Sequence, residues 1–329
     1  MNRQISRRDI LLGGAAIGLA GALGAARLVI PAGARVGASD ALAAGIRGLV
    51  GATIGAANYS GTDETQASNK FDQLVGRPMA RKVQKIYYQE GDWPSSIPQK
   101  DLEIIQDLGA KLLISFKPFR TPPSVFASEK ANLEAAIDMY QAAGATFDVT
   151  LWQEPNDGRS FGSGDAYKQY VSTYGPTVHT AGAPLVYDPG SGLRPGESPT
   201  QLYQSWHDYY PGDALIDKIV VDYYGSAWNK NVRLDEIEDI ADSANPPKSF
   251  GIGEWNDDAV STGTLGTGLF KDYVQYLIDL FTMRLNLGKT NGDIIFWMGD
   301  NAVDLPADQI LSSSDFKIPF VQMLYDRLS

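Results

Sequence analysis

The feature that most constrains the fold is a repeated alternation of short apolar segments with longer amphipathic ones. Eight short segments have the continuous apolar character of parallel strands that are buried on both faces. They span residues 48–55, 83–88, 111–116, 147–152, 183–187, 218–223, 249–253 and 293–298. Because parallel strands need long crossover connections, which are usually helices, this alternation predicts repeated βα units.

Amphipathic helical patterns fill several of the connections. The clearest cover residues 98–108, 128–143, 164–180 and 265–287, and a last one covers 318–328. Eight βα units in a chain of 329 residues predict an α/β fold with one (β/α)8 barrel, a TIM barrel, in which the last helix closes the ring against the first. In such a barrel the functional site lies at the C-terminal ends of the strands.

Residues 1–43 are predicted to be an export signal that precedes the barrel domain of residues 44–329. Arg7 and Arg8 stand before an uncharged segment of 17 residues, 10–26, which resembles a twin-arginine signal. A retained membrane anchor is the alternative, although this segment is short for a span. Ala41-Leu42-Ala43 has the small residues at its first and third positions that a signal-peptide cleavage site requires. The expected location is secreted or extracytoplasmic, with the twin-arginine export machinery as a partner.

Composition excludes several classes of function. The chain has no cysteine and two histidines, which rules out thiolate chemistry and leaves little material for a zinc site or a Ser–His triad. Its net charge of −11 disfavours binding to nucleic acid or to an anionic membrane, and favours a neutral ligand such as a glycan. We therefore expect no metal, no cofactor and no nucleic-acid partner. Nothing in the sequence indicates obligate assembly, so we expect a monomer.

Two of the predicted strands deliver a glutamate to their C-terminal ends. Trp152-Gln153-Glu154-Pro155-Asn156 follows one strand, which Pro155 prevents from continuing, and Gly253-Glu254-Trp255 follows another. A single glutamate at a strand end is usually a salt-bridge partner or a helix cap. Two glutamates that face one barrel mouth, in contrast, are the pair of catalytic carboxyl groups that glycoside hydrolysis requires.

In the predicted barrel, Glu154 follows the fourth strand and Glu254 follows the seventh. With these two motifs the chain resembles the clan A glycoside hydrolases. In that clan the acid/base follows strand four and the nucleophile follows strand seven. The resemblance implies a retaining mechanism, in which Glu254 attacks the anomeric carbon and Glu154 protonates the leaving oxygen and then activates water. The two carboxyl groups of such an enzyme lie about 5–5.5 Å apart.

The same resemblance implies a set of substrate contacts. In the clan, a tyrosine after strand six bonds to the nucleophile, a tryptophan after strand eight stacks on the sugar, and an asparagine precedes the acid/base. The chain has glutamine in place of that asparagine, which leaves the stereochemistry of the sugar open. These positions are Tyr224, Trp297 and Gln153. Asn156 and Asn58, which follow predicted strands, are expected to contact substrate hydroxyls in addition.

The sequence therefore predicts an exported retaining glycoside hydrolase that acts on a β-linked oligo- or polysaccharide of the mannan, glucan or xylan type. One alternative is a cell-surface barrel that binds glycans without cleaving them. Another is a barrel hydrolase or lyase of different chemistry, which would use Asp300 or Asp222.

Overall fold

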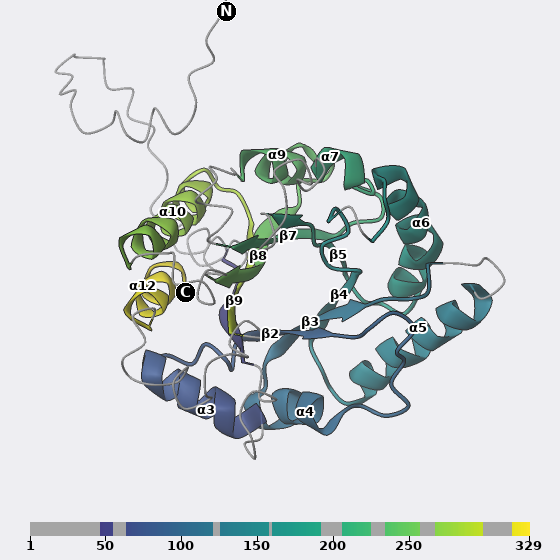
Figure 1. The fold of residues 1–329 in the computed structure, drawn as a ribbon, viewed down its shortest axis with the longest axis horizontal. Coiled ribbons are helices and arrows are strands. Elements are labelled where there is room, and N and C mark those ends of the chain that lie inside the picture. The colour runs from purple at the N-terminus through teal and green to yellow at the C-terminus, as the bar shows by residue number, and fades with distance from the viewer. Residues whose placement is uncertain are drawn as a thin grey trace, which may run out of the picture. The chain divides into compact units, whose positions relative to one another are not determined.

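The strands of this protein form one parallel sheet that curves into a barrel, with helices packed around its outside (Figure 1). The computed structural model describes residues 47–54, 64–120, 126–157, 160–191, 206–224, 234–256, 267–298 and 318–329. The strands are β1 (Val50–Ile54), β2 (Val83–Tyr87), β3 (Lys111–Phe116), β4 (Phe147–Leu151), β5 (Leu185–Tyr187), β6 (Gly190–Ser191), β7 (Lys218–Tyr224), β8 (Ser249–Asn256) and β9 (Asn291–Met298).

Strand pairing follows the order β1-β9-β8-β7-β5-β4-β3-β2, and the short β6 pairs with β7 beside this path. The two strands at the ends of this order, β1 and β2, lie side by side, and the backbone N–H of Lys85 donates to Thr53 Oγ1 at 2.6 Å. The barrel is therefore nearly closed. Each of the eight predicted strands coincides with an observed one, which confirms the predicted fold class. Only β6 was not predicted.

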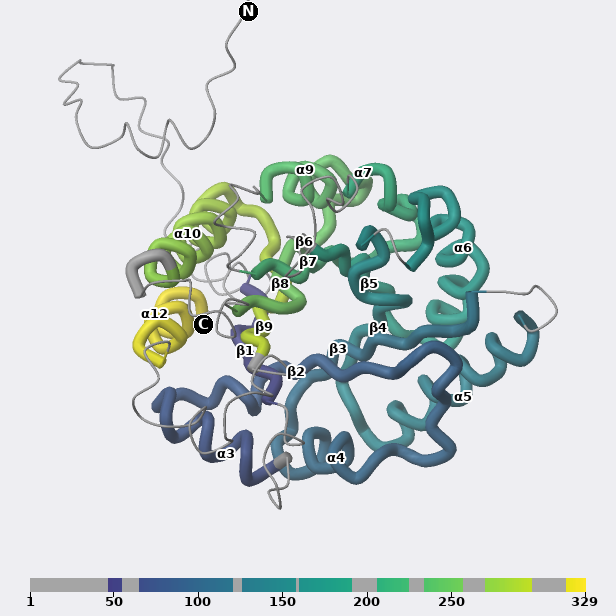
Figure 2. The backbone as a smooth tube through the Cα atoms, viewed as in Figure 1, coloured from purple at the N-terminus to yellow at the C-terminus, as the bar shows by residue number. Residues whose placement is uncertain are grey.

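The helices run between the strands on the outer surface. They are α3 (Glu64–Val75), α4 (Gln99–Leu102), which continues as a π-helical turn over Glu103–Leu108, α5 (Phe126–Ala142), α6 (Gly164–Thr180), α7 (Trp206–Tyr209), α9 (Asp235–Ser243), α10 (Thr267–Asn286) and α12 (Ile318–Leu328). Helices α3, α7 and α9 were not among the clearest helical patterns of the sequence. The last helix lies between α10 and α3, and Gln322 Nε2 donates to Val75 O at 2.6 Å (Figure 2). The ring thus closes as predicted.

The barrel interior is layered, because alternate residues of each strand point inward. At the N-terminal ends of the strands, Lys111 Nζ bridges Asp148 at 2.6 Å and Asp293 at 2.5 Å, and Lys218 Nζ contacts Asp148 at 2.7 Å. Two residues further along the strands lies an apolar layer, which consists of Val83, Leu113, Val186, Val220 and Ile295. Four of the five next inward positions are polar, Lys85, Ser115, Asp188 and Asp222, and the fifth is Trp297; they form the base of the candidate site.

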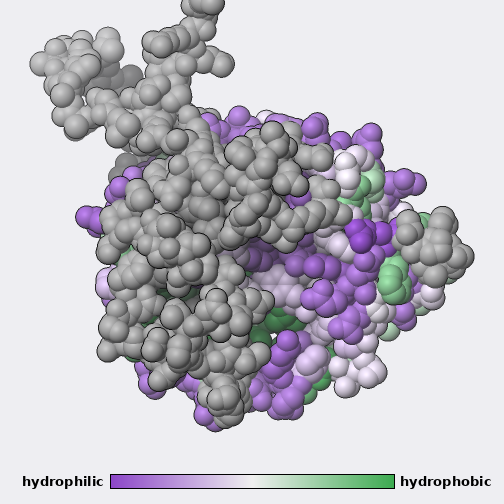
Figure 3. All heavy atoms as spheres, viewed as in Figure 1, coloured by the Kyte–Doolittle hydropathy of each residue, from purple (hydrophilic) through white to green (hydrophobic). Residues whose placement is uncertain are grey.

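Hydrophilic residues gather toward the middle of the face seen in Figure 3, and hydrophobic ones are scattered. No helix in the described ranges combines the length and the apolar character that a membrane crossing requires.

Gly51 allows β1 and β2 to approach closely. A Cβ at this position would lie 2.3 Å from the carbonyl oxygen of Val83, which is backbone and cannot move aside. We expect Gly51→Ala to lower the free energy of unfolding by about 1–3 kcal/mol, the usual cost of overpacking. Chemical denaturation followed by circular dichroism measures this change.

Gly175→Ala is the matched control for this prediction. Gly175 lies inside α6, where an added Cβ would meet the flexible end of the Leu185 side chain at 3.1 Å. Alanine also favours a helix by about 1 kcal/mol over glycine. Equal losses of stability in the two variants would contradict a special role for Gly51.

Candidate active site

The backbone after β4 is unusual at both Trp152 and Glu154. These are the only non-glycine residues with positive φ in the described part of the chain, at 70° and 49°. Such conformations are uncommon, and they persist where the surrounding structure fixes them, often at functional sites. Here the backbone N–H of Trp152 donates to Phe116 O at 3.0 Å, and that of Glu154 donates to Asp188 O at 2.8 Å. Glu154 is thereby held at the C-terminal edge of the barrel.

A β-bulge in β8 determines where Glu254 points. In the pairing with β7, Val221 faces Ile252 and Asp222 faces Glu254, so Gly253 is an extra residue in β8. Ile252 packs outward in the core, and without the bulge strict alternation would turn Glu254 outward as well. The bulge turns Glu254 into the barrel and leaves the next residue, Trp255, buried in the outer core.

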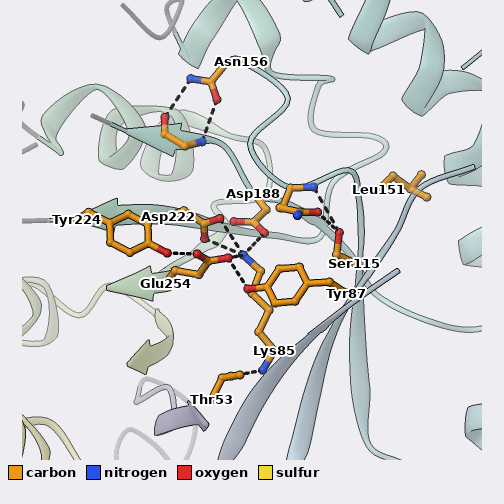
Figure 4. A network of polar contacts seen from close by, with 12 residues as sticks. Thr53, Lys85, Tyr87, Ser115, Leu151, Asn156, Asp188, Asp222, Tyr224 and Glu254 are labelled. Atoms are coloured by element: carbon orange, nitrogen blue, oxygen red, sulfur yellow. Dashed lines mark hydrogen bonds and ion pairs between the residues drawn. The ribbon is translucent and has the colours of Figure 1, made fainter. Parts of the chain in front are cut away.

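Three side chains bind the carboxylate of Glu254 (Figure 4). Tyr87 donates its hydroxyl to Oε1 and Tyr224 donates its hydroxyl to Oε2. Lys85 Nζ lies 2.8 Å from Oε1, and its side chain is completely buried, whereas 10% of the Glu254 side chain remains exposed. The donors come from β2 and β7, which fixes the carboxylate from two sides.

These donors keep Glu254 ionised. Burial alone would raise the pKa of this carboxyl, but the charge of Lys85 and the hydrogen bonds from Lys85, Tyr224 and Tyr87 outweigh burial and lower the pKa below its ordinary value. The tyrosines respond in the opposite direction. Burial, followed by the charge of Glu254, raises the pKa of Tyr87 and that of Tyr224 well above the ordinary value, so both remain hydrogen-bond donors.

Lys85 also contacts two aspartates below Glu254. Its Nζ lies 2.8 Å from Asp188 Oδ2, and 2.8 and 2.9 Å from the two carboxylate oxygens of Asp222. Both aspartate side chains are fully buried. Gly253 makes room for them, since a Cβ there would lie 2.6 Å from Asp222 Oδ1 and 2.8 Å from Asp188 Oδ1.

The charges of Glu154 and Glu254 both affect the pKa of the same two residues, Tyr224 and Lys117. Burial raises the pKa of Tyr224, and the charges of Glu254 and Glu154 both add to this rise. Burial lowers the pKa of Lys117, and the same two glutamates oppose that change. Glu154 and Glu254 therefore lie within electrostatic range of one tyrosine on β7 and one lysine that directly follows β3.

The structure brings three of the predicted contact residues to this site. Tyr224 bonds to Glu254, as the resemblance implies. Trp297, at the end of β9, packs its ring edge-on against Tyr87 at a centroid distance of 5.1 Å, next to the same carboxylate. Gln153 accepts a hydrogen bond from Ser115 Oγ of β3.

Asn156 corrects an expectation. It was predicted to contact a substrate, but it is completely buried. Its Nδ2 donates to Gly190 O at 3.0 Å, and its Oδ1 accepts from Gly190 N at 2.9 Å, so its amide holds the chain at β6 instead. The other predicted contact residue, Asn58, and the alternative catalytic residue Asp300 lie outside the described residues.

Sequence reasoning missed Lys85, Tyr87 and Asp188. Lys85 and Tyr87 occupy alternate positions of a predicted buried strand, and Asp188 directly follows another. A charged residue in the middle of an apolar strand was the available signal, because an ionised group is rarely buried without a partner. Within the described ranges, no group of three or more His, Asp or Glu side chains is arranged to hold a metal ion.

No protein-family model and no curated protein matches the sequence. Several solved structures share its fold. An endo-β-1,4-mannanase from Cellulomonas fimi, described with the glycoside hydrolase family 26 mannanases, aligns with a TM-score of 0.54 and 16% identity over 86% of this chain and 70% of its own. A β-mannanase from a symbiotic protist of the termite Reticulitermes speratus aligns with a TM-score of 0.51 and 12% identity over 88% and 89%.

A glucosidase from Croceicoccus marinus aligns with a TM-score of 0.56 and 12% identity over 86% of this chain and 68% of its own. At such identities the likeness shows a common fold. The barrel is thus similar to those of several glycoside hydrolases.

Lys85→Met should destabilise the protein in a pH-dependent manner. The substitution leaves three buried carboxyl groups without their cation, which costs about 3–5 kcal/mol at neutral pH. Without the cation the pKa of Glu254 rises above its unfolded-state value, and the pKa values of Asp188 and Asp222, already raised in the wild type, rise further. Their raised pKa favours the folded state only at low pH, so the deficit should grow from pH 5 to pH 8. In the wild type, burial alone would lower the pKa of Lys85, but the charges of Asp188, Asp222 and Glu254 raise it well above its ordinary value. The ammonium group therefore stays charged, and stabilises the folded state, throughout this pH range.

Urea unfolding at several pH values measures the effect. Lys271→Met, on the exposed face of α10, serves as the control and should change stability little at any pH. A Lys85→Met protein as stable as the wild type at pH 7 would show that the lysine does not neutralise this cluster.

Proposed function

We propose that this protein is an exported retaining glycoside hydrolase that acts on a β-linked oligo- or polysaccharide of the mannan, glucan or xylan type. The observation that carries the proposal is the environment of Glu254, a carboxylate at the barrel mouth that a buried lysine and two half-buried tyrosines hold ionised. A second carboxyl, on Glu154, stands at the same edge on a strained backbone. A retaining glycosidase needs such a pair, one ionised and one able to carry a proton.

In the proposed mechanism Glu254 attacks the anomeric carbon and forms a covalent glycosyl ester. Lys85, Tyr87 and Tyr224 orient its carboxylate, since donors on both oxygens restrict rotation of the group. Glu154 gives its proton to the leaving glycosidic oxygen. It then accepts a proton from the water that cleaves the ester, which returns both carboxyl groups to their starting states.

The substrate class rests on the aromatic lining and on the fold. Trp297 and Tyr87 place two rings beside Glu254, and flat rings suit the C–H faces of a pyranose. Solved proteins with a similar barrel include two described as mannanases and one as a glucosidase. These support a β-linked glycan, with mannan as the first polysaccharide to test.

Replacing either glutamate should abolish most of the activity. Glu254→Gln cannot form the ester, and Glu154→Gln should lose about 10²–10⁴-fold in kcat/KM on a polysaccharide, the usual contribution of a general acid. On an aryl glycoside with a good leaving group Glu154→Gln should lose less in forming the ester, because that leaving group needs no proton. Reducing-sugar release from mannan, glucan and xylan, together with aryl glycoside assays, measures these changes.

Glu134→Gln, on the exposed face of α5, is the control and should leave activity unchanged. Full activity in the Glu154 or Glu254 variants would refute the assignment. A wild-type protein that binds these glycans in affinity electrophoresis but cleaves none of them would instead be a glycan-binding barrel.

The export part of the proposal depends on Arg7 and Arg8. Changing both to lysine keeps the charge but removes the arginine pair that the twin-arginine machinery reads. We expect the double variant to stay in the cytoplasm of a bacterial host that has this machinery, whereas an Arg3→Lys control is exported. Cell fractionation with immunoblotting measures the distribution. Equal export of the double variant and the wild type would contradict a twin-arginine signal.

A further inference from the structure

Three carboxyl groups converge on one buried ammonium group beneath the barrel mouth (Figure 4). Asp188, Asp222 and Glu254 each place an oxygen 2.8 Å from Lys85 Nζ. The side chains of Lys85 and both aspartates are fully buried, and the apolar layer lies directly below them. If all four groups were ionised, the cluster would carry a net charge of −2 with almost no solvent to screen it.

Such an excess charge is unfavourable, so the cluster is expected to take up a proton. Crowded carboxylates commonly share one, because like charges a few ångströms apart cannot both remain ionised in a buried site. Glu254 is the least suitable place for that proton. It accepts hydrogen bonds from Tyr87 and Tyr224 in addition to its contact with Lys85, and it is the one carboxylate of the three that reaches solvent.

The two aspartates are the better place. Asp188 Oδ2 forms an ion pair with Lys85 Nζ at 2.8 Å, whereas the other carboxylate oxygen, Oδ1, has no such donor. A buried acceptor without a donor costs about 1–3 kcal/mol. Asp222 stands beside it, since an oxygen of each aspartate lies within 2.8 Å of the point where a Gly253 Cβ would stand. A proton on Asp222 would supply a donor for Asp188 Oδ1.

We propose that Asp188 and Asp222 share one proton at neutral pH, and that with Lys85 they form a positioning unit that is neutral overall beneath the Glu254 carboxylate. The role assigned to Glu254 rests on the proposed function, whereas the shared proton does not. Two ionised aspartates would push a proton onto Glu254. If the aspartate pair carried no charge, Lys85 would form an ion pair with Glu254 alone. This tighter ion pair would make the Glu254 carboxylate a weaker nucleophile.

The electrostatics of the pair agree with this assignment. Burial raises the pKa of Asp222 well above its ordinary value, and the charges of Asp188 and Glu254 raise it further against the opposing charge of Lys85. Burial also raises the pKa of Asp188; the charge and hydrogen bond of Lys85 oppose this rise most, and a contact with Asp222 opposes it less. The titratable groups that face the pair or Glu254 are Lys85 and Tyr87 of β2, Lys117 after β3, Glu154 after β4, Tyr167 of α6, Tyr224 of β7 and Glu254 of β8.

Carboxyl NMR of the whole protein with ¹³Cγ-labelled aspartate tests the proton directly. The wild type at pH 7.5 should show a protonated aspartate whose signal disappears in Asp222→Asn and in Asp188→Asn but persists in the exposed control Asp138→Asn. A second protonated signal from the buried Asp101, whose pKa burial also raises, would persist in all three variants. A wild-type spectrum without a protonated signal assignable to Asp188 or Asp222 would overturn the proposal, even if no variant folds.

The pH dependence of kcat/KM tests the positioning role. In Asp222→Asn the amide replaces a carboxyl that is already neutral, so the acid limb should stay where it is in the wild type, whatever the rate. In Asp188→Asn/Asp222→Asn the last negative charge of the pair is lost, and the acid limb should move to lower pH by roughly one unit. An acid limb that already moves to lower pH in the single variant, and moves further in the double one, would show that both aspartates are ionised.

Discussion

A lysine ammonium group inside a barrel has no water around it, so carboxylates must provide its solvation. Lys85 Nζ meets this need with three of them, drawn from the segment after β5, from β7 and from β8. The arrangement joins distant parts of the chain at one point. Glu254 obtains its position and its charge from this contact, and the two tyrosines that share its carboxylate complete the set of donors. The chemistry proposed for the mouth depends on this single cation.

The local backbone is adapted to that requirement. The bulge at Gly253 turns Glu254 inward, and the missing side chain of Gly253 leaves room for both aspartates. On the opposite side of the mouth, positive φ at Trp152 and Glu154 breaks β4 sharply. Both glutamates thus stand at irregular points of the backbone: Glu254 follows an inserted residue in β8, and Glu154 has a positive φ that most residues avoid.

The sequence predicts the barrel well because each buried parallel strand is a short apolar run, a local signal. It also places Glu154 and Glu254 near the C-terminal ends of β4 and β8, although β8 continues to Asn256 where the pattern predicted an end at Gly253. The role of Asn156 could not be foreseen, because its burial depends on β6, which the chain forms 34 residues later. Lys85 was missed since a charge inside an apolar run has no partner in the local sequence. Its three partners are all distant.

The apolar layer between the two charged layers of the barrel has a consequence for how this molecule can evolve. It separates the ion pairs of Lys111, Lys218, Asp148 and Asp293 from Lys85 and its aspartates. Substitutions among the ion pairs at the N-terminal ends of the strands can therefore change thermal stability while the protonation states around Lys85 stay the same. Selection for a new growth temperature and selection for a new sugar would then act on different layers of side chains in one barrel.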